Sequence, residues 1–544
     1  MSSKLSHQTH GAWSGWLDGI VSDTEPDTPT VTPSPDQAWA LPPMPEDVID
    51  PQLFKLTMTV VAQMDAMVTE YFAREGYKYT PYRDKRQVKA FDSGWPNVYS
   101  KEKDETRVAP ADLFAHKASV IDPFPYDDIP GVAALKEYVT STPSVLQRMR
   151  PENEAGTLPD DLAESFMDTS IVLFPNSIYD RATALGLEIT DPAVADLYAQ
   201  RERSWLAPTL EYQLVVPLLL TDFDISDEGL QVDDETRIER LTDDDLRCIS
   251  EVDRFTVMAP LADAAKWAVV VDMAAMENIG EGRTLFSRDA PIDTRGVEAV
   301  CDAIRIVSLA RPGWARVFRR PRNWARHWED NLPNLNHVFT ARRYPSYFED
   351  GGWLKEHAGV TANEAAQLPV VAAALKTSSA QAKLASRRLS TALLRDTPDD
   401  QLIDACIGLE ALLGQKGAEI SYRVAVRAAA LLATKAEEPR APELTFKLAR
   451  KVYDRRSELV HGSTSGKHAM VQPQEGGHEF STHSVAVWLL REVLLERLVR
   501  SDWSVEDLDA MVLQGLAPAN PADPGADTEE AQASATDETT IGDA

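Results

Sequence analysis

The chain has 544 residues, a formal net charge of −31 and 43% hydrophobic residues. Its length predicts several domains with enough apolar side chains to bury a core. The negative charge argues against a general nucleic-acid or membrane coat, because such surfaces are usually basic. The three cysteines (Cys248, Cys301 and Cys406) lie far apart, which argues against a disulfide framework and against a Cys-based zinc site.

The beginning of the sequence and its apolar runs predict a cytoplasmic protein. Residues 1–20 lack the continuous apolar core of a signal peptide. The longest apolar run, residues 214–220, is too short to cross a membrane. We therefore expect no membrane partner.

The first two blocks of the chain differ in composition. Residues 1–45 include a segment rich in Pro, Thr, Ser and Asp, which is typical of a disordered tail. Residues 46–204 have a mainly helical pattern of unknown type, and residues 53–76 form its clearest amphipathic stretch.

Residues 205–360 predict a mixed α/β region. Residues 211–225 and 266–275 are typical of buried strands, and residues 243–255 of a helix. Residues 311–328 interleave arginines with aromatic residues, a combination that suits base stacking and phosphate binding. The candidates for nucleic-acid binding are Arg316, Arg319, Arg320 and Trp324. The alternative, which we favour, is a packed strand or loop with aromatic residues in the core and solvated arginines.

Residues 361–515 predict a helical domain, and residues 516–544 an acidic, disordered tail. On a helical wheel of residues 446–460, Arg456 falls in the middle of the apolar arc and Arg455 at its edge. A buried, unpaired charge costs several kcal/mol, so Arg456 requires a partner, a water-filled cleft or a ligand.

A second charge faces inward from another helix of this domain. The wheel of residues 400–414 places Glu410 at the centre of its apolar arc. Glu410 could pair with Arg456, or with Arg423 or Arg427 of the intervening helix. Either pairing would give the inward-facing carboxylate a partner of opposite charge. The structural interpretation is a buried ion pair that fixes helix register, with His461 as a polar helix end before Gly462. Against it, residues 376–500 hold 19 Lys and Arg against 15 Asp and Glu, which suits a phosphate ligand.

Three segments of this domain resemble the Apea-like HEPN domains of the HEPN superfamily. They are RRLSTALLRDTPDDQLIDACIGLEALLG, EISYRVAVRAAALLA and KLARKVYDRRSELVHGS. The resemblance covers the helical domain, with a weaker match over about residues 205–350. It implies a four-helix core, preceded here by the mixed α/β region, within a mainly α, multidomain chain.

The superfamily motif is an arginine followed after four to six residues by a histidine. Arg456 and His461 carry it here, with Arg455 as the alternative arginine. The residue after the arginine is polar in active relatives, and Ser457 stands there. The resemblance implies a metal-independent endoribonuclease of a bacterial defence or stress system. It equally allows a non-catalytic binding, scaffold or sensor module.

Such a pair suits RNA cleavage by attack of a 2′-hydroxyl on the neighbouring phosphate. His461 would transfer a proton, and Arg456 would hold the phosphate and stabilise its developing charge. Glu410 would orient an arginine. On an ideal helix His461 points about 140° away from Arg456, so either the helix ends irregularly or two copies meet across a two-fold axis. HEPN domains generally use the second solution, which predicts a homodimer.

No other motif predicts a cofactor. Residues 462–467 are one residue short of a phosphate-binding loop and follow a helix rather than a strand. The histidines of residues 478–483 are five apart and so do not share one helix face. We predict no metal site and RNA as the partner.

Overall fold

The computed structural model describes residues 39–515 apart from 75–77, 100–105, 118, 120, 150–151, 154–155, 158, 252–258, 281–291, 309, 329–331, 333, 416–418, 436–439, 463–465, 473–477 and 501–502. The described residues are mainly helical, which confirms the fold class in its coarse form. The acidic tail and most of the N-terminal tail lie outside them. Two compact units divide between Ala373 and Ala374, inside helix α10 (Ala362–Thr377). The boundary that we expect from the sequence, at residue 360, precedes this helix.

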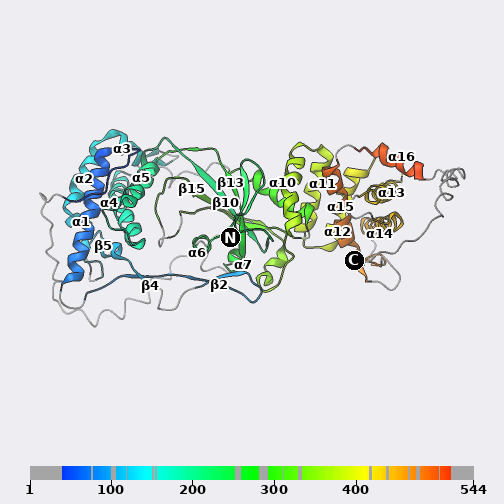
Figure 1. Cartoon of the computed structure of the whole chain (residues 1–544), viewed down its shortest axis with the longest axis horizontal. Helices are drawn as coiled ribbons and strands as arrows, with labels where there is room; N and C mark the ends of the chain where they lie inside the picture. The colour runs from blue at the N-terminus through cyan, green and yellow to red at the C-terminus, as the bar shows by residue number, and fades with distance from the viewer. Residues whose placement is uncertain are drawn as a thin grey trace, which may run out of the picture. The chain divides into compact units, whose positions relative to one another are not determined.

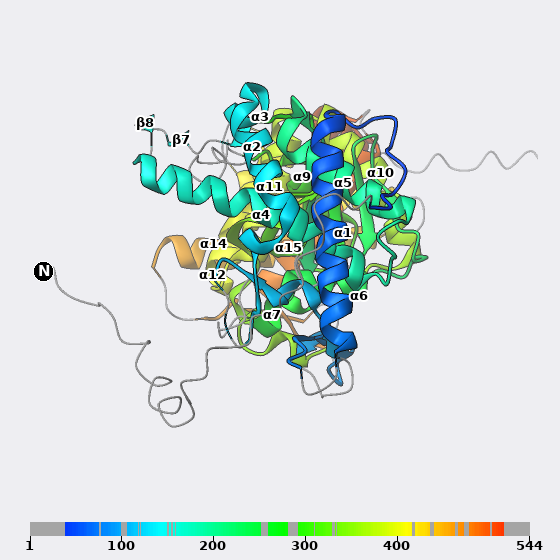
Figure 2. The same cartoon turned by 90° about the vertical axis from the view of Figure 1, so that its left-hand side faces the viewer.

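The N-terminal part of the first unit is a group of helices with one apolar core. Its helices are α1 (Pro51–Ala73), α2 (Pro130–Ser141), α3 (Pro143–Met149), α4 (Asp160–Ala184) and α5 (Pro192–Leu206). Figure 2 looks onto α1, with α2 and α4 beside it. This confirms the predicted amphipathic helix of residues 53–76 as far as Ala73, the last residue of α1.

A buried carboxylate fixes the start of α1. Asp50 caps the helix by accepting from the amides of Gln52 and Leu53. Glu202 of α5 is fully buried and accepts from the amides of Ile49 and Asp50 at 2.7 and 2.8 Å. A buried carboxylate is tolerated when donors surround it in this way, so Glu202 joins α5 to α1.

Two sequence predictions for this region need correction. The prediction of a disordered tail up to residue 45 is wrong for residues 39–45, because Trp39 and Leu41 pack against the helical core. Short strands also interrupt the predicted helical block. They are β1 (Tyr82–Asp84), β2 (Gln87–Ala90), β3 (Pro96–Tyr99), β4 (Thr106–Val108), β5 (Phe114–Ala115), β6 (Phe124–Pro125), β7 (Glu152–Asn153) and β8 (Gly156–Thr157), all in two-stranded pairs.

The rest of the first unit is built on a six-stranded antiparallel sheet (Figure 1). Its strand order is β11 (Leu230–Gln231), β12 (Thr236–Arg240), β13 (Ala265–Asp272), β10 (Tyr212–Leu219), β15 (Trp314–Pro321) and β16 (Asn336–Arg343). The short pair β9 (Thr209–Leu210) and β14 (Met276–Glu277) lies outside this sheet. The sheet confirms the two predicted buried strands, β10 and β13.

Helices cover both faces of the central strands. On one face Val215 and Val270 form a core with Leu246 and Ile249 of α6 (Asp243–Glu251). On the other face α9 (Arg295–Val307) packs against β13. The short helix α7 (Ala259–Asp263) contacts β3 and β10. Because both faces are covered, β10 and β13 are apolar almost throughout, unlike a half-solvated antiparallel strand.

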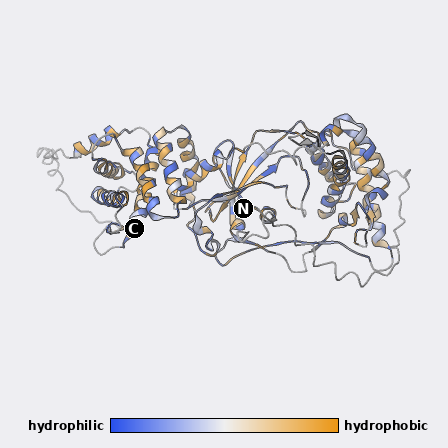
Figure 3. Ribbon diagram, turned by 180° about the vertical axis from the view of Figure 1, so that it is seen from behind, coloured by the Kyte–Doolittle hydropathy of each residue, from blue (hydrophilic) through white to orange (hydrophobic). Residues whose placement is uncertain are grey.

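The second unit is a helical bundle around α15 (Thr482–Val499), which contacts each of the four helices that precede it. These are α11 (Ala380–Leu394), α12 (Pro398–Leu413), α13 (Ile420–Ala433) and α14 (Pro442–Val460). The hairpin of β17 (Met470–Val471) and β18 (Phe480–Ser481) joins α14 to α15, and α16 (Val505–Gly515) packs on α13. Orange and blue residues are mixed along these helices, as expected for amphipathic helices (Figure 3).

The crossing of α12 and α15 depends on a glycine. A Cβ atom at Gly408 would lie 2.6 Å from Cδ2 of Leu490. A larger residue would therefore push α15 away from α12. This close approach fixes α12, the helix that carries Glu410.

Candidate functional site

Arg456 and Glu410 meet where α14 lies against α12. Nη2 of Arg456 is 3.7 Å from Oε1 of Glu410. The same charges act on Cys406 of α12 and Tyr453 of α14, which are both buried. Because Cys406 precedes Glu410 by one turn and Tyr453 precedes Arg456 by three residues, the four side chains form one cluster, which we call the Arg456 cluster.

The cluster is short of hydrogen bonds. Oε1 of Glu410 and the hydroxyl of Tyr453 are shielded from solvent, and neither has a hydrogen-bond partner among the described residues. Burial raises the pKa of Tyr453 and of Cys406, and the charge of Glu410 raises both further while Arg456 lowers them. Both groups are therefore neutral at physiological pH, and Glu410 and Arg456 carry the charge of the cluster.

Arg456 remains accessible to a ligand. Its side chain is 38% exposed and makes no hydrogen bond with any residue that the structure describes. The last turn of α14 is open as well, since Val460 is 54% exposed. The predicted apolar arc is thus confirmed as far as Tyr453 and is wrong at its end, where Arg456 lies at the rim of the packed face.

His461 lies at the carboxyl end of the same helix. It is the C-cap residue of α14, and its side chain is exposed. Its amide donates to the carbonyl of Ser457 at 3.1 Å, the i−4 bond of a continuing helix. The helix therefore does not end irregularly before His461, and the divergence of about 140° from Arg456 that an ideal helix imposes still applies.

The neighbours of Arg456 have other partners. Arg455 pairs with Asp399 at 2.9 Å and with Glu458 at 3.2 Å. Nδ1 of His468 lies 2.8 Å from Oε1 of Glu458. Ser457 is exposed. Arg455 thus contacts Glu458, which in turn lies beside His468. Arg455 does not pair with Glu410.

Neither of the two arginines of α13 forms an ion pair with Glu410 in the described structure. Arg427 is 2% exposed and donates to Asp509 of α16, to the carbonyl of Leu413 and to Gln415. Arg423 is half-buried, and its charge acts on Asp509. Of the three arginines that the sequence offers to Glu410, only Arg456 lies beside it in the described structure.

Sequence reasoning missed a buried acid on α12. Asp404 accepts from Arg388 at 2.8 Å and from Arg395 at 3.1 Å, and it is almost fully buried. It falls outside the apolar arc of residues 400–414 on the wheel, and only the position of α11 gives it partners. Asp404 joins α11 to α12 and so helps to hold Glu410 in place.

The candidate nucleic-acid residues of the first unit are used for packing. Arg316 and Arg319 of β15 are buried, and Nη1 of Arg316 donates to the carbonyl of Ile249 at 2.7 Å. Arg320 pairs with Glu239 at 2.7 Å. Trp324 is 3% exposed, and its ring nitrogen donates to a backbone carbonyl. None of the four presents a free face for stacking a base.

The favoured alternative for residues 311–328 is therefore half right. Trp314, Phe318 and Trp324 do fill the core. The expectation of solvated arginines is wrong for Arg316 and Arg319. Strand alternation explains the burial of Arg316, because residues 316 and 318 lie on the same face of β15 and Phe318 is in the core.

Asp263 of α7 gives the first unit a pH-dependent stability. Burial raises the pKa of this carboxyl to about 7, although Arg316, at 4.0 Å, and Arg86 lower it. A folded pKa above the unfolded value means that protonation favours the folded state, and this contribution is lost as pH rises through 7. We expect the free energy of unfolding of the wild type to fall by about 2 kcal/mol from pH 5.5 to pH 8 relative to Asp263→Asn.

Urea unfolding of both proteins at several pH values measures this difference. Asp196→Asn, at an exposed carboxyl of the same unit, is the control and should keep the pH dependence of the wild type. Equal pH dependence in Asp263→Asn and the wild type would contradict the assignment.

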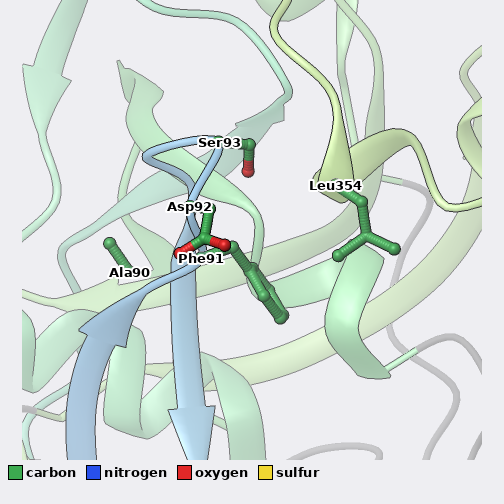
Figure 4. Close-up of a pocket in the computed structure, with 5 residues that line it drawn as sticks. All are labelled: Ala90, Phe91, Asp92, Ser93 and Leu354. Carbon is green, nitrogen blue, oxygen red and sulfur yellow. The ribbon is translucent and has the colours of Figure 1, made fainter.

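The first unit also holds a hollow of about 460 Å³. Residues from β2, from the turn that follows it and from one distant segment line it: Ala90, Phe91, Asp92, Ser93 and Leu354. Figure 4 shows Leu354 opposite the turn, with the carboxylate of Asp92 as the one charged group drawn. Because no basic side chain lines it, this hollow does not suit a phosphate ligand.

Among the described residues, no group of three or more His, Cys, Asp or Glu side chains is placed to hold a metal ion. No described helix has both the length and the apolar character that crossing a membrane requires. No family model, no curated protein and no solved structure matches the chain.

Proposed function

We propose that the second unit is an Apea-like HEPN domain and that the protein is a metal-independent endoribonuclease of a bacterial defence or stress system. The observation that carries the proposal is the state of Arg456. Its guanidinium is held near Glu410 at 3.7 Å, has no hydrogen bond within the described residues and is open to solvent. An oriented, solvent-accessible arginine with unused donors is suited to a phosphate group.

The reaction follows from the two side chains of the motif. The 2′-hydroxyl of a ribose attacks the adjacent phosphorus, and the bond from phosphorus to the 5′-oxygen of the next nucleotide breaks. His461 takes part in the proton transfers, because an imidazole titrates near neutral pH. Arg456 stabilises the charge that develops on the phosphate oxygens. The products are a 2′,3′-cyclic phosphate and a 5′-hydroxyl, and no metal is required.

A homodimer completes the site in this proposal. Arg456 and His461 diverge along one continuing helix, so a single copy does not bring both to one phosphate. Two copies related by a two-fold axis would place Arg456 of one opposite His461 of the other. The excess of basic residues between positions 376 and 500 favours an anionic ligand at this unit.

The same ion pair supports a second candidate, a non-catalytic binding, scaffold or sensor module. In that case Glu410 and Arg456 serve the register of α12 and α14, and His461 is a solvated helix end. The 3.7 Å contact favours this candidate, and the solvent access of Arg456 favours the first.

The experiment that tests the proposed function uses the purified full chain and a mixed-sequence RNA in excess chelator. We expect cleavage that continues in the chelator and leaves 2′,3′-cyclic phosphate ends. The same RNA with 2′-deoxyribose at every position is the control and should stay intact, because it lacks the nucleophile. Cleavage of both substrates, or of neither, would contradict the proposal.

A further inference from the structure

A second imidazole is held by a carboxylate close to the proposed site. His468 precedes β17, and Nδ1 of its ring lies 2.8 Å from Oε1 of Glu458, in the last turn of α14. This nitrogen is shielded from solvent, and its contact with Glu458 is a close approach without hydrogen-bond geometry. Glu458 precedes His461 by three residues, so both imidazoles are attached to the same end of α14.

The backbone of His468 is held by two neighbours. The amide of His468 donates to Oε2 of Glu458 at 3.4 Å, and Thr482 of α15 donates through its hydroxyl to the carbonyl of His468. Arg455 fixes Glu458 in turn, and Asp399 of α12 anchors Arg455. These contacts fix the position of Glu458 beside His468, and a proton-transfer group requires a partner in a fixed position.

The other ring nitrogen is available for chemistry. Nε2 of His468 has no hydrogen-bond partner among the residues that the structure describes. A carboxylate beside Nδ1 favours a proton on that nitrogen and leaves Nε2 to exchange a proton with a substrate. The pair of Glu458 and His468 therefore has the arrangement of a general acid or base and its orienting partner.

We propose that His468 is a second catalytic residue of the ribonuclease site and protonates the leaving 5′-oxygen, with Glu458 as its positioning residue. This inference rests on the proposed function. Cleavage moves one proton off the 2′-hydroxyl and delivers one to the 5′-oxygen. His461 accepts the first, and the imidazolium of His468, paired with Glu458, gives up the second from Nε2. Both rings then return to their starting states by exchange with water, so the reaction consumes no co-reactant.

The division of roles follows from the surroundings of the two rings. The carboxylate of Glu458 stabilises positive charge on the ring of His468, which suits the group that gives up a proton. His461 is exposed and has no acidic partner among the described residues, which suits the group that accepts a proton.

The test compares two RNA oligonucleotides that differ in one atom. In the second, sulfur replaces the bridging 5′-oxygen at the cleaved linkage, and a thiolate leaves without being protonated. We expect the His468→Ala variant to cleave the ordinary RNA roughly 100-fold or more slowly than the wild type. The same variant should cleave the sulfur substrate at nearly the wild-type rate. Glu458→Gln should show the same selective loss to a smaller degree. The His461→Ala variant should cleave neither substrate.

The controls separate this inference from the proposed function. His478→Ala removes an exposed imidazole just before β18 and should leave both rates unchanged. If the wild type cleaves neither RNA, the proposed function fails and the role of His468 fails with it. If the wild type cleaves both RNAs, two outcomes overturn only the role of His468. In one, His468→Ala slows the cleavage of both RNAs equally; in the other, it slows the cleavage of neither.

A measurement without RNA checks the positioning residue. In the full chain labelled with ¹⁵N in its histidines, neutral His468 should carry its proton on Nδ1, because the carboxylate of Glu458 lies beside that nitrogen. Glu458→Ala should abolish this preference. A proton on Nε2 in the wild type would overturn the assignment of Glu458.

Discussion

Arg456→Ala is expected to lower the rate of RNA cleavage by roughly 100- to 1,000-fold, the usual loss when one donor to a developing oxyanion is removed. The physical reason is that neutral alanine offers the phosphate neither charge nor donors. Arg456→Lys should recover only part of the rate, because a lysine keeps the charge and loses the planar, two-pronged geometry. Initial rates with saturating and subsaturating RNA measure both effects.

The same variant separates the two candidate functions. Arg456 is 38% exposed, so its ion pair with Glu410 contributes little to stability. The nuclease proposal therefore predicts a nearly unchanged melting temperature and dimer content alongside the lost activity. The scaffold candidate instead requires that this pair holds α12 and α14 in register, and so predicts a clear fall in melting temperature. Lys447→Ala, at an exposed position of α14, is the control and should change neither property.

Arg427→Ala is expected to have the largest effect on stability, a loss of about 3 kcal/mol in the free energy of unfolding of the second unit. Arg427 is buried and contacts α12 through the carbonyl of Leu413 and α16 through Asp509. Its removal leaves a cavity, an unpaired carbonyl and a detached α16. Calorimetry of the full chain should show a lower melting temperature for one unfolding transition, while the transition of the first unit stays in place.

Arg423→Ala is the matched control, since Arg423 lies one turn before Arg427 on the same helix and is only half-buried. It should cost less than about 1 kcal/mol, as exposed charges usually do. Equal melting temperatures for the two variants would show that Arg427 does not hold α12 and α16 together.

Hydrophobic patterning was sufficient to predict the elements that are buried in a regular way. The apolar runs of β10 and β13 and the stripe of α1 are long enough to show their period. The two-stranded pairs between residues 82 and 125 were not predicted, because strands of two to four residues are too short to show an alternation. The buried state of Arg316 was predictable from alternation but was masked by the expectation that charges are solvated.

The candidate site could be predicted in part. The wheels of α12 and α14 correctly place Glu410 and Arg456 on facing sides, because both lie amid apolar residues at helical spacing. They do not reveal that the last turn of α14 is uncovered, since that depends on where neighbouring helices end. The approach of His468 to Glu458 depends on the path of the chain between α14 and β17, which no periodicity encodes.

The measurement that tests the central claim most directly is the rate of RNA cleavage by purified His461→Ala beside the wild type, both in excess chelator. The side chain of His461 is exposed and makes no hydrogen bond or ion pair with a described residue, so its loss should leave the fold intact. We expect cleavage by the variant to fall to the level of buffer alone while the wild type degrades the RNA. Equal rates for the two proteins would contradict the assignment of Arg456 and His461 as a catalytic pair.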